Sequence, residues 1–209
     1  MKTFLNGILA GIALGIAGTV NLMVPNKIVG ASLFGFGLFL ILCYQFKLYT
    51  GAIGYLATKK RGEIGSYIGT LIVIWLGNFA GTWLVGFLVR QTRIYDGLAE
   101  RVTGMCAVKL ADTPLSIFIL AIFCGILMYV AVESFRQTDW PGVFRALMVF
   151  LCVSIFILAG FEHCIANMYY FAASNFVVTE DKTVPYILLM TLGNSVGGML
   201  IPFADKVRK

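Results

Sequence analysis

The feature that most constrains this chain is a series of apolar segments, each long enough to cross a lipid bilayer. Hydrophobic residues make up 59% of the 209 residues and charged residues only 12%. A chain of this size could not bury so much apolar surface in water. A bilayer core about 30 Å thick needs about 20 apolar residues per helix. We therefore predict an all-α integral membrane protein, a single domain with six transmembrane helices at residues 4–24, 28–57, 64–89, 115–132, 143–173 and 184–204.

The basic residues predict the orientation of these helices. The formal net charge is +6, but the Lys and Arg residues lie mostly outside the apolar segments. Cytoplasmic loops of membrane proteins are enriched in Lys and Arg. The cluster Lys59-Lys60-Arg61 is the strongest indication, and placing it inside also places the basic C-terminal tail inside. We expect both termini in the cytoplasm and no nucleic-acid partner.

Two of the segments predict broken helices. Segments 28–57 and 143–173 hold roughly 30 residues each, so straight helices would be about 45 Å long. Charge falls near the middle of both, at Lys47 and at Glu162-His163. Irregular backbone at that depth needs protein or water around it. Short matching strings occur in the same order in both halves, so we predict two inverted three-helix repeats, 1–89 and 115–209, joined by a polar stretch at 90–114.

Glu162 and His163 are the first candidates for chemistry, because ionisable groups inside a membrane segment are costly and usually functional. His163 is the only histidine, and an imidazole can exchange a proton near neutral pH. The alternative is a buried histidine held by a neighbour's hydrogen bond. With no second histidine and no C-x-x-C pair, we expect no metal and no cofactor. The chain also lacks a G-x-S-x-G motif, and we expect no enzyme activity.

Lys47 has two interpretations. It could draw anions inward, or it could form an ion pair with Glu162, because the two residues occupy equivalent places in the repeats. The ion pair is slightly favoured. Lys109 lies in the polar stretch, where most lysines are solvated. Phe34 and Leu38 lie one helical turn apart, so both could narrow one path.

Residues 160–168, Gly-Phe-Glu-His-Cys-Ile-Ala-Asn-Met, closely resemble the signature G-F-E-H-x-[IV]-A-N-M of the formate/nitrite transporter family. Residues 47–51 and 192–198 resemble other parts of that family in the right order. The resemblance implies an aquaporin-like protomer, a homopentamer with one pore per protomer, and a place in the inner (cytoplasmic) membrane of a prokaryote. Two positions depart from the family: Lys47 replaces an acidic residue, and Tyr129 replaces an asparagine.

The resemblance also implies roles for individual residues. A central His163 would lie between two hydrophobic constrictions. Phe34 and Leu38 would form the constriction on the cytoplasmic side, and Tyr49 and Phe156 would form the other. Thr50 would hydrogen-bond near His163, with Glu162 and Asn194 close by. Lys109 would match the family's vestibule lysine and attract anions, and Lys47, which departs from the family, could attract them by its own charge.

The function that we expect is a channel for small monovalent acid anions, with formate or nitrite foremost. A bare anion is heavily penalised in a dry constriction, whereas the neutral acid avoids most of that penalty. His163, or water ordered by it, would supply the proton. Hydrosulfide, acetate and lactate are alternative substrates. A channel for neutral solutes such as water or glycerol is a second alternative, although two asparagine-proline-alanine boxes are missing.

Overall fold

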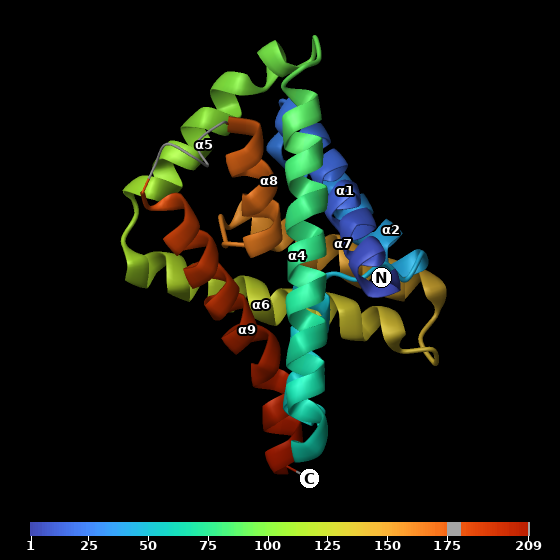
Figure 1. Cartoon of the computed structure of the whole chain (residues 1–209). Helices are drawn as coiled ribbons and strands as arrows, with labels where there is room; N and C mark the ends of the chain where they lie inside the picture. Colours follow the sequence, from blue (N-terminus) through green and yellow to red (C-terminus); the bar gives the residue numbers. More distant parts are fainter. Residues whose placement is uncertain (175–180, 209) are drawn as a thin grey trace.

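The computed structural model describes residues 1–174 and 181–208 and is helical almost throughout (Figure 1). Residues 175–180 and 209, which fall in the predicted second repeat, lie outside the described part. The elements in chain order are α1 (Lys2–Met23), α2 (Lys27–Cys43), α3 (Tyr49–Ala52), the 3-10 helices η1 (Ile53–Thr58) and η2 (Arg61–Glu63), α4 (Ile64–Val89), η3 (Tyr95–Gly97), α5 (Ala99–Ala111), α6 (Pro114–Arg136), α7 (Gly142–Leu158), α8 (Cys164–Ser174) and α9 (Thr183–Arg208).

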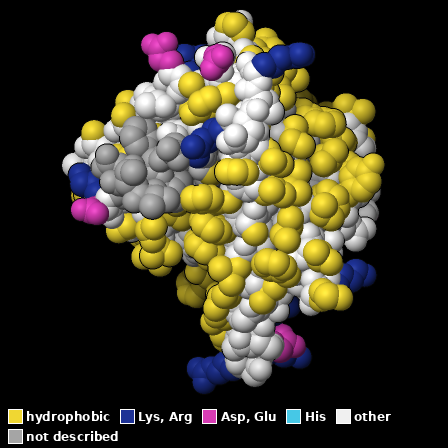
Figure 2. Space-filling model, turned by 45° about the horizontal axis from the view of Figure 1, so that its top comes forward, with side chains coloured by type: hydrophobic (Ala, Val, Ile, Leu, Met, Phe, Trp, Pro, Cys, Tyr) yellow, Lys and Arg dark blue, Asp and Glu magenta, His cyan; other side chains and the backbone are white. Residues whose placement is uncertain are grey.

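The outer surface of the molecule is apolar, as a lipid environment requires. Large side chains such as Phe36, Ile72, Ile155 and Leu188 are about half exposed or more. Hydrophobic side chains cover much of the face in Figure 2, and Lys and Arg are few and scattered, several of them at its upper and lower ends. Helices α1, α4 with the turn before it, α6 and α9 are long and apolar enough to cross a membrane, and α2 and α7 are shorter apolar helices.

The predicted breaks in segments 28–57 and 143–173 are confirmed, and both have the same backbone geometry. Helix α2 ends where Gln45 adopts a left-handed φ of 56°, and α7 ends where Gly160 adopts a φ of 73°. In each case the amide of the following residue donates a hydrogen bond to the carbonyl five positions earlier in the chain. These bonds run from Phe46 to Ile41 and from Phe161 to Phe156, each at 2.9 Å. This is the Schellman arrangement, which satisfies carbonyl groups at a helix end. The chain then runs extended for a few residues before α3 or α8 begins.

Glycines let the long helices approach closely. A Cβ atom added to Gly7 of α1 would lie 3.0 Å from the Ile74 carbonyl oxygen of α4, and one added to Gly77 of α4 would lie 2.7 Å from the Phe4 carbonyl oxygen of α1. The α6–α9 pair is equivalent, because a Cβ on Gly193 would lie 2.7 Å from the Phe118 carbonyl oxygen. In lipid no hydrophobic driving force holds helices together, so the close van der Waals packing that these small residues allow does so instead.

The helices of the two halves pack in matching pairs. Helix α1 lies against α4 and α2, and α6 lies against α9 and α7. The helical segment that follows each break packs on the long helix of the other half: α8 packs on α4, and η1, which continues α3, packs on α9. The polar stretch 90–114, for which the sequence indicated no helix, contains α5, which packs over α8. That placement brings Lys109 within reach of Glu162, beside the start of α8.

Candidate functional site

His163 lies at the start of α8 and caps that helix with its own ring. Its Nδ1 accepts a hydrogen bond from the amide of Ala166 at 3.1 Å, three residues into the helix, which is the geometry of an N-cap side chain. Its Nε2 lies 3.0 Å from Oγ1 of Thr50. Because Nδ1 accepts, the proton of the neutral ring is on Nε2, and that N–H donates to Thr50. The positive end of the α8 dipole also disfavours a second proton.

Thr50 belongs to α3, so this hydrogen bond joins the short helices that follow the two breaks. Thr50 and His163 are each 1% exposed. The expected contact between these two residues is therefore present in the structure. It lies where the two chain breaks meet, deep in the protein.

Glu162 forms an ion pair with Lys109, and not with Lys47, the partner that the sequence favoured. The Nζ atom of Lys109 lies 2.8 and 2.6 Å from the two carboxylate oxygens, and the side chains are 13% and 4% exposed. Asn167 donates to the same carboxylate at 2.7 Å. The predicted Lys47–Glu162 pair was wrong. Helix α5 brings Lys109 over α8, and Lys47 instead lines a cavity on the other side of the break.

Two asparagines clamp the breaks in identical ways. The side-chain amide of Asn194 donates to the carbonyls of Ala121 and Glu162, each at 2.8 Å, and its oxygen accepts from the amide of Cys164 at 2.9 Å. Asn194 thus holds the backbone on both sides of His163. No hydrogen bond between its side chain and the His163 ring is present among the described residues.

Asn78 does the same for the first break. It donates to the carbonyls of Gly7 and Lys47 at 2.8 Å and accepts from the amide of Tyr49 at 2.9 Å. Both asparagines are 0% exposed. A buried amide with its hydrogen-bonding groups satisfied fixes the backbone around it. The two clamps therefore set where Thr50 and His163 meet.

Aromatic rings pack against the histidine. The ring of Phe156 is stacked on His163 with centroids 5.5 Å apart, and Phe34 meets Phe156 edge-on at 6.0 Å. The grouping of Phe34 with Leu38, and of Tyr49 with Phe156, into two constrictions stays a prediction. Phe34 and Phe156 form one apolar contact beside His163, because α2 and α7 pack against each other. The Tyr49 hydroxyl lies 2.9 Å from Oγ of Ser195.

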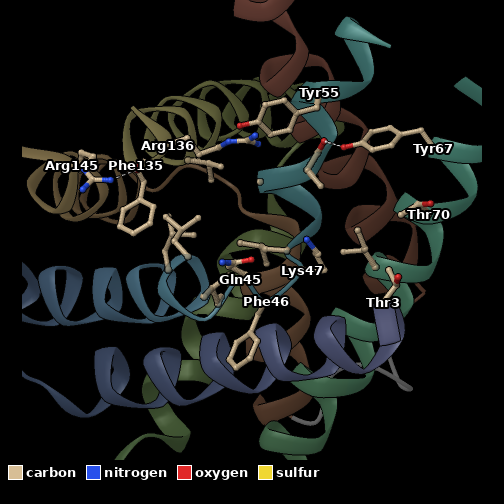
Figure 3. A pocket seen from close by; sticks show the side chains of 18 of the residues that line it. Thr3, Gln45, Phe46, Lys47, Tyr55, Tyr67, Thr70, Phe135, Arg136 and Arg145 are labelled. Carbon is tan, nitrogen blue, oxygen red and sulfur yellow. Dashed lines mark hydrogen bonds between the residues drawn. The ribbon is translucent and has the colours of Figure 1, made fainter. Parts of the chain in front are cut away.

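A cavity of about 610 Å³ borders the first break (Figure 3). Leu38 and Gly51 line it, and Gly51 follows Thr50 directly in the chain. Phe34 lies one helical turn beyond Leu38. The residues of the Thr50–His163 pair and of the Phe34–Phe156 contact are not among those that line the cavity. Among the side chains that line the cavity, three carry positive charge: Lys47, Arg136 and Arg145.

Comparison with known proteins identifies the family. The family model described as formate/nitrite transporter matches residues 1–204. The chain belongs to the formate/nitrite transporter family.

Relatives of this chain include the formate channel FocA of Haemophilus influenzae, which is 27% identical to it over 80% of this chain and 64% of the relative. They also include the nitrite transporter NirC of Salmonella typhimurium, 29% identical over 86% of this chain and 71% of the relative. This chain therefore spans about two thirds of the length of these relatives. A solved structure, "Pentameric formate channel with formate bound", has the same fold with a TM-score of 0.85. It is 24% identical and covers 99% of this chain and 96% of that chain.

Several residues at the site of this family member were not singled out from the sequence. Asn78 was visible only as the counterpart of Asn194 in the matching strings Leu-Gly-Asn of the two halves. Asn167 lies in the family signature, but its hydrogen bond to Glu162 could be seen only once the first turn of α8 was known. Arg136 and Arg145 gave no signal beyond their charge. Their place in the cavity depends on how α6 and α7 meet the first break.

Proposed function

We propose that this protein is a transmembrane channel for small monovalent acid anions, with formate or nitrite as substrate. The protomer would cross the inner membrane six times as two inverted three-helix repeats, residues 1–89 and 115–209, with both termini in the cytoplasm. Five protomers would assemble, each with its own pore. The family, and the fold shared with a pentameric formate channel, support this proposal.

The observation that carries the proposal is a single polar contact set in an apolar path. The Thr50–His163 pair would lie between Leu38, which lines the cavity, and the edge-on contact of Phe34 with Phe156, whose ring stacks on His163. A hydrated ion would be excluded by such apolar side chains. A small polar solute that sheds its water would find hydrogen-bond partners only at the middle of the path.

The cap on Nδ1 bears on how the anion is neutralised. A neutral imidazole that gives up its only N–H proton would become an anion, which is not a realistic donor near neutral pH. A cationic ring could donate, but it would have to give up the Ala166 hydrogen bond. Of the two proton sources considered for this site, ordered water is therefore favoured over His163 itself.

His163 and Thr50 would then act as hydrogen-bonding groups. The Nε2–H group donates to Thr50, which leaves the Thr50 hydroxyl free to donate to the passing anion. Low dielectric raises the pKa of the anion in the path, so it takes a proton from a water molecule, whose hydroxide stays in the aqueous cavity, and crosses the aromatic contact as the neutral acid. It ionises again on the far side. Lys47 and Lys109 would lie on either side of the path, with the charge of Lys109 balanced by Glu162.

Proteoliposome flux with labelled formate and nitrite at two pH values tests the proposal. His163→Asn keeps an oxygen that can cap α8 but loses the N–H directed at Thr50. We expect formate flux to fall at both pH values while the protein stays folded. Flux at the wild-type rate with an unchanged pH profile would remove His163 from the mechanism. Absence of flux for every anion tested, including hydrosulfide, acetate and lactate, with glycerol passage in stopped-flow light scattering, would favour the neutral-solute channel instead.

A further inference from the structure

The cavity in Figure 3 is lined by more positively charged side chains than a small monovalent anion would need. Lys47, Arg136 and Arg145 come from three separate parts of the chain: the first break, the end of α6 and the start of α7. No Asp or Glu side chain is among those that line the cavity in the described residues. Nor does any of the three cations form an ion pair within residues 1–174 and 181–208. The cavity therefore carries positive charge without a protein counter-charge in its wall.

The wall orients these cations. The guanidinium of Arg136 lies over the ring of Tyr55, 4.6 Å from the centroid, and stacking of this kind leaves the edge of the guanidinium free to donate. Figure 3 shows Lys47 pointing into the space on the same side as Arg136. Glu133 does not line the cavity, but its carboxylate lies behind the wall, where it accepts hydrogen bonds from the Tyr55 hydroxyl and from Gln137. Lys59, which lies 4.8 Å from the ring centroid of Tyr67, adds positive charge beside the wall.

The size of the cavity points to a ligand larger than the permeating ion. Its volume of about 610 Å³ equals roughly 20 water molecules at about 30 Å³ each, far more than formate or nitrite would fill. Guanidinium groups bind phosphate oxygens in a fork geometry, and a lysine ammonium adds a point charge. Three cations from three directions suit a compact anion with more than one negative charge.

We propose that this cavity binds a soluble compact polyanion of the phosphate or pyrophosphate class. Such an ion cannot continue past Leu38, because a doubly charged group loses far more hydration energy than a monovalent one in an apolar contact. It stays in the cavity and blocks the path from that side. The cavity is thus an inhibitory site, distinct from the Thr50–His163 pair.

Binding is tested by calorimetric titration of pyrophosphate into the protein in nanodiscs of phosphatidylcholine, which carries no net charge. The wild type should bind one pyrophosphate per protomer, and Lys47→Gln and Arg136→Gln should each weaken binding about tenfold or more, because each removes charge-assisted hydrogen bonds. Lys206→Gln is the matched control, since this exposed lysine lies in the last turn of α9, outside the cavity lining. Thermal unfolding of each variant verifies that it is folded. No saturable binding, or equal weakening in Lys206→Gln, would overturn the proposal.

Two further measurements distinguish a soluble ligand from a lipid headgroup, and binding from block of the path. Replacing a fifth of the lipid by phosphatidylglycerol should leave pyrophosphate affinity unchanged. Loss of binding would mean that a lipid headgroup occupies the cavity, and would overturn a soluble ligand. Formate flux into proteoliposomes should fall when pyrophosphate is present on both sides, and unchanged flux with the site saturated would overturn the block. Flux without pyrophosphate tests the proposed channel function separately from the binding.

Discussion

Lys109→Met is expected to destabilise this protein far more than loss of an exposed ion pair. The ammonium of Lys109 contacts both carboxylate oxygens of Glu162, and the side chains are only 13% and 4% exposed. Removing one partner of a buried pair leaves an uncompensated charge and costs about 3–5 kcal/mol. A chain of 209 residues loses about 2–4 °C in Tm per kcal/mol. The apparent Tm should therefore fall by about 6–20 °C at a fixed heating rate.

A thiol-reactive fluorophore can follow this unfolding. Four cysteines, Cys106, Cys124, Cys152 and Cys164, are buried and would react only when the protein unfolds. The exposed Cys43 is replaced by serine in every variant so that it does not react beforehand.

Two comparisons make the test decisive. Arg208→Met removes an ion pair with side chains that are 80% and 46% exposed, and should leave Tm unchanged within error. The double variant Lys109→Met/Glu162→Gln should recover much of the loss, because no charge is then left alone. A Lys109→Met variant that behaves like Arg208→Met, or a double variant no more stable than the single one, would show that the Lys109–Glu162 pair does not hold the protein together in this way.

Three further predictions follow from the backbone and from the clamps, each measured by the same unfolding assay. Gln45→Gly should stabilise the protein by about 1 kcal/mol, because Gln45 has a left-handed φ that disfavours side chains. Gly160→Ala, at the equivalent position, should destabilise it by a similar amount, and the same sign for both would contradict the matched geometry. Gly77→Ala should destabilise α4 against α1, whereas Gly69→Ala in the same helix, with nothing within 4 Å of the added Cβ, should be neutral or stabilising by up to about 1 kcal/mol. Asn78→Leu leaves the Tyr49 amide and two carbonyls without this partner, at about 1–3 kcal/mol each, and a loss below 1 kcal/mol would show that the clamp is dispensable.

The sequence predicted much of the fold because its signals are local. Segments 28–57 and 143–173 were too long for straight helices and carried charge at their centres, and this located both breaks. The signature around His163 and the matching strings around Asn78 and Asn194 located the parts that meet. These inferences need only helix length, hydrophobicity and order along the chain.

The side-chain partners were harder to predict, because they depend on how separate helices pack. Glu162 pairs with Lys109 rather than Lys47 because α5 folds back over α8, and a polar stretch gives little sign of that. Phe34 faces Phe156 because α2 packs on α7. The capping bond from Ala166 to the histidine ring is a detail of one helical turn, and it bears on the choice between the two proton sources that the sequence left open.

The state of the His163 ring is the central claim, and one spectrum measures it. The chain has a single histidine, so protein labelled only with ¹⁵N-histidine gives solid-state NMR signals from this imidazole alone. In lipid with formate present, from pH 5 to pH 8, the account predicts a protonated Nε2 and an unprotonated Nδ1 throughout. Two protonated ring nitrogens at pH 5 to 6, or a proton on Nδ1 alone, would contradict it.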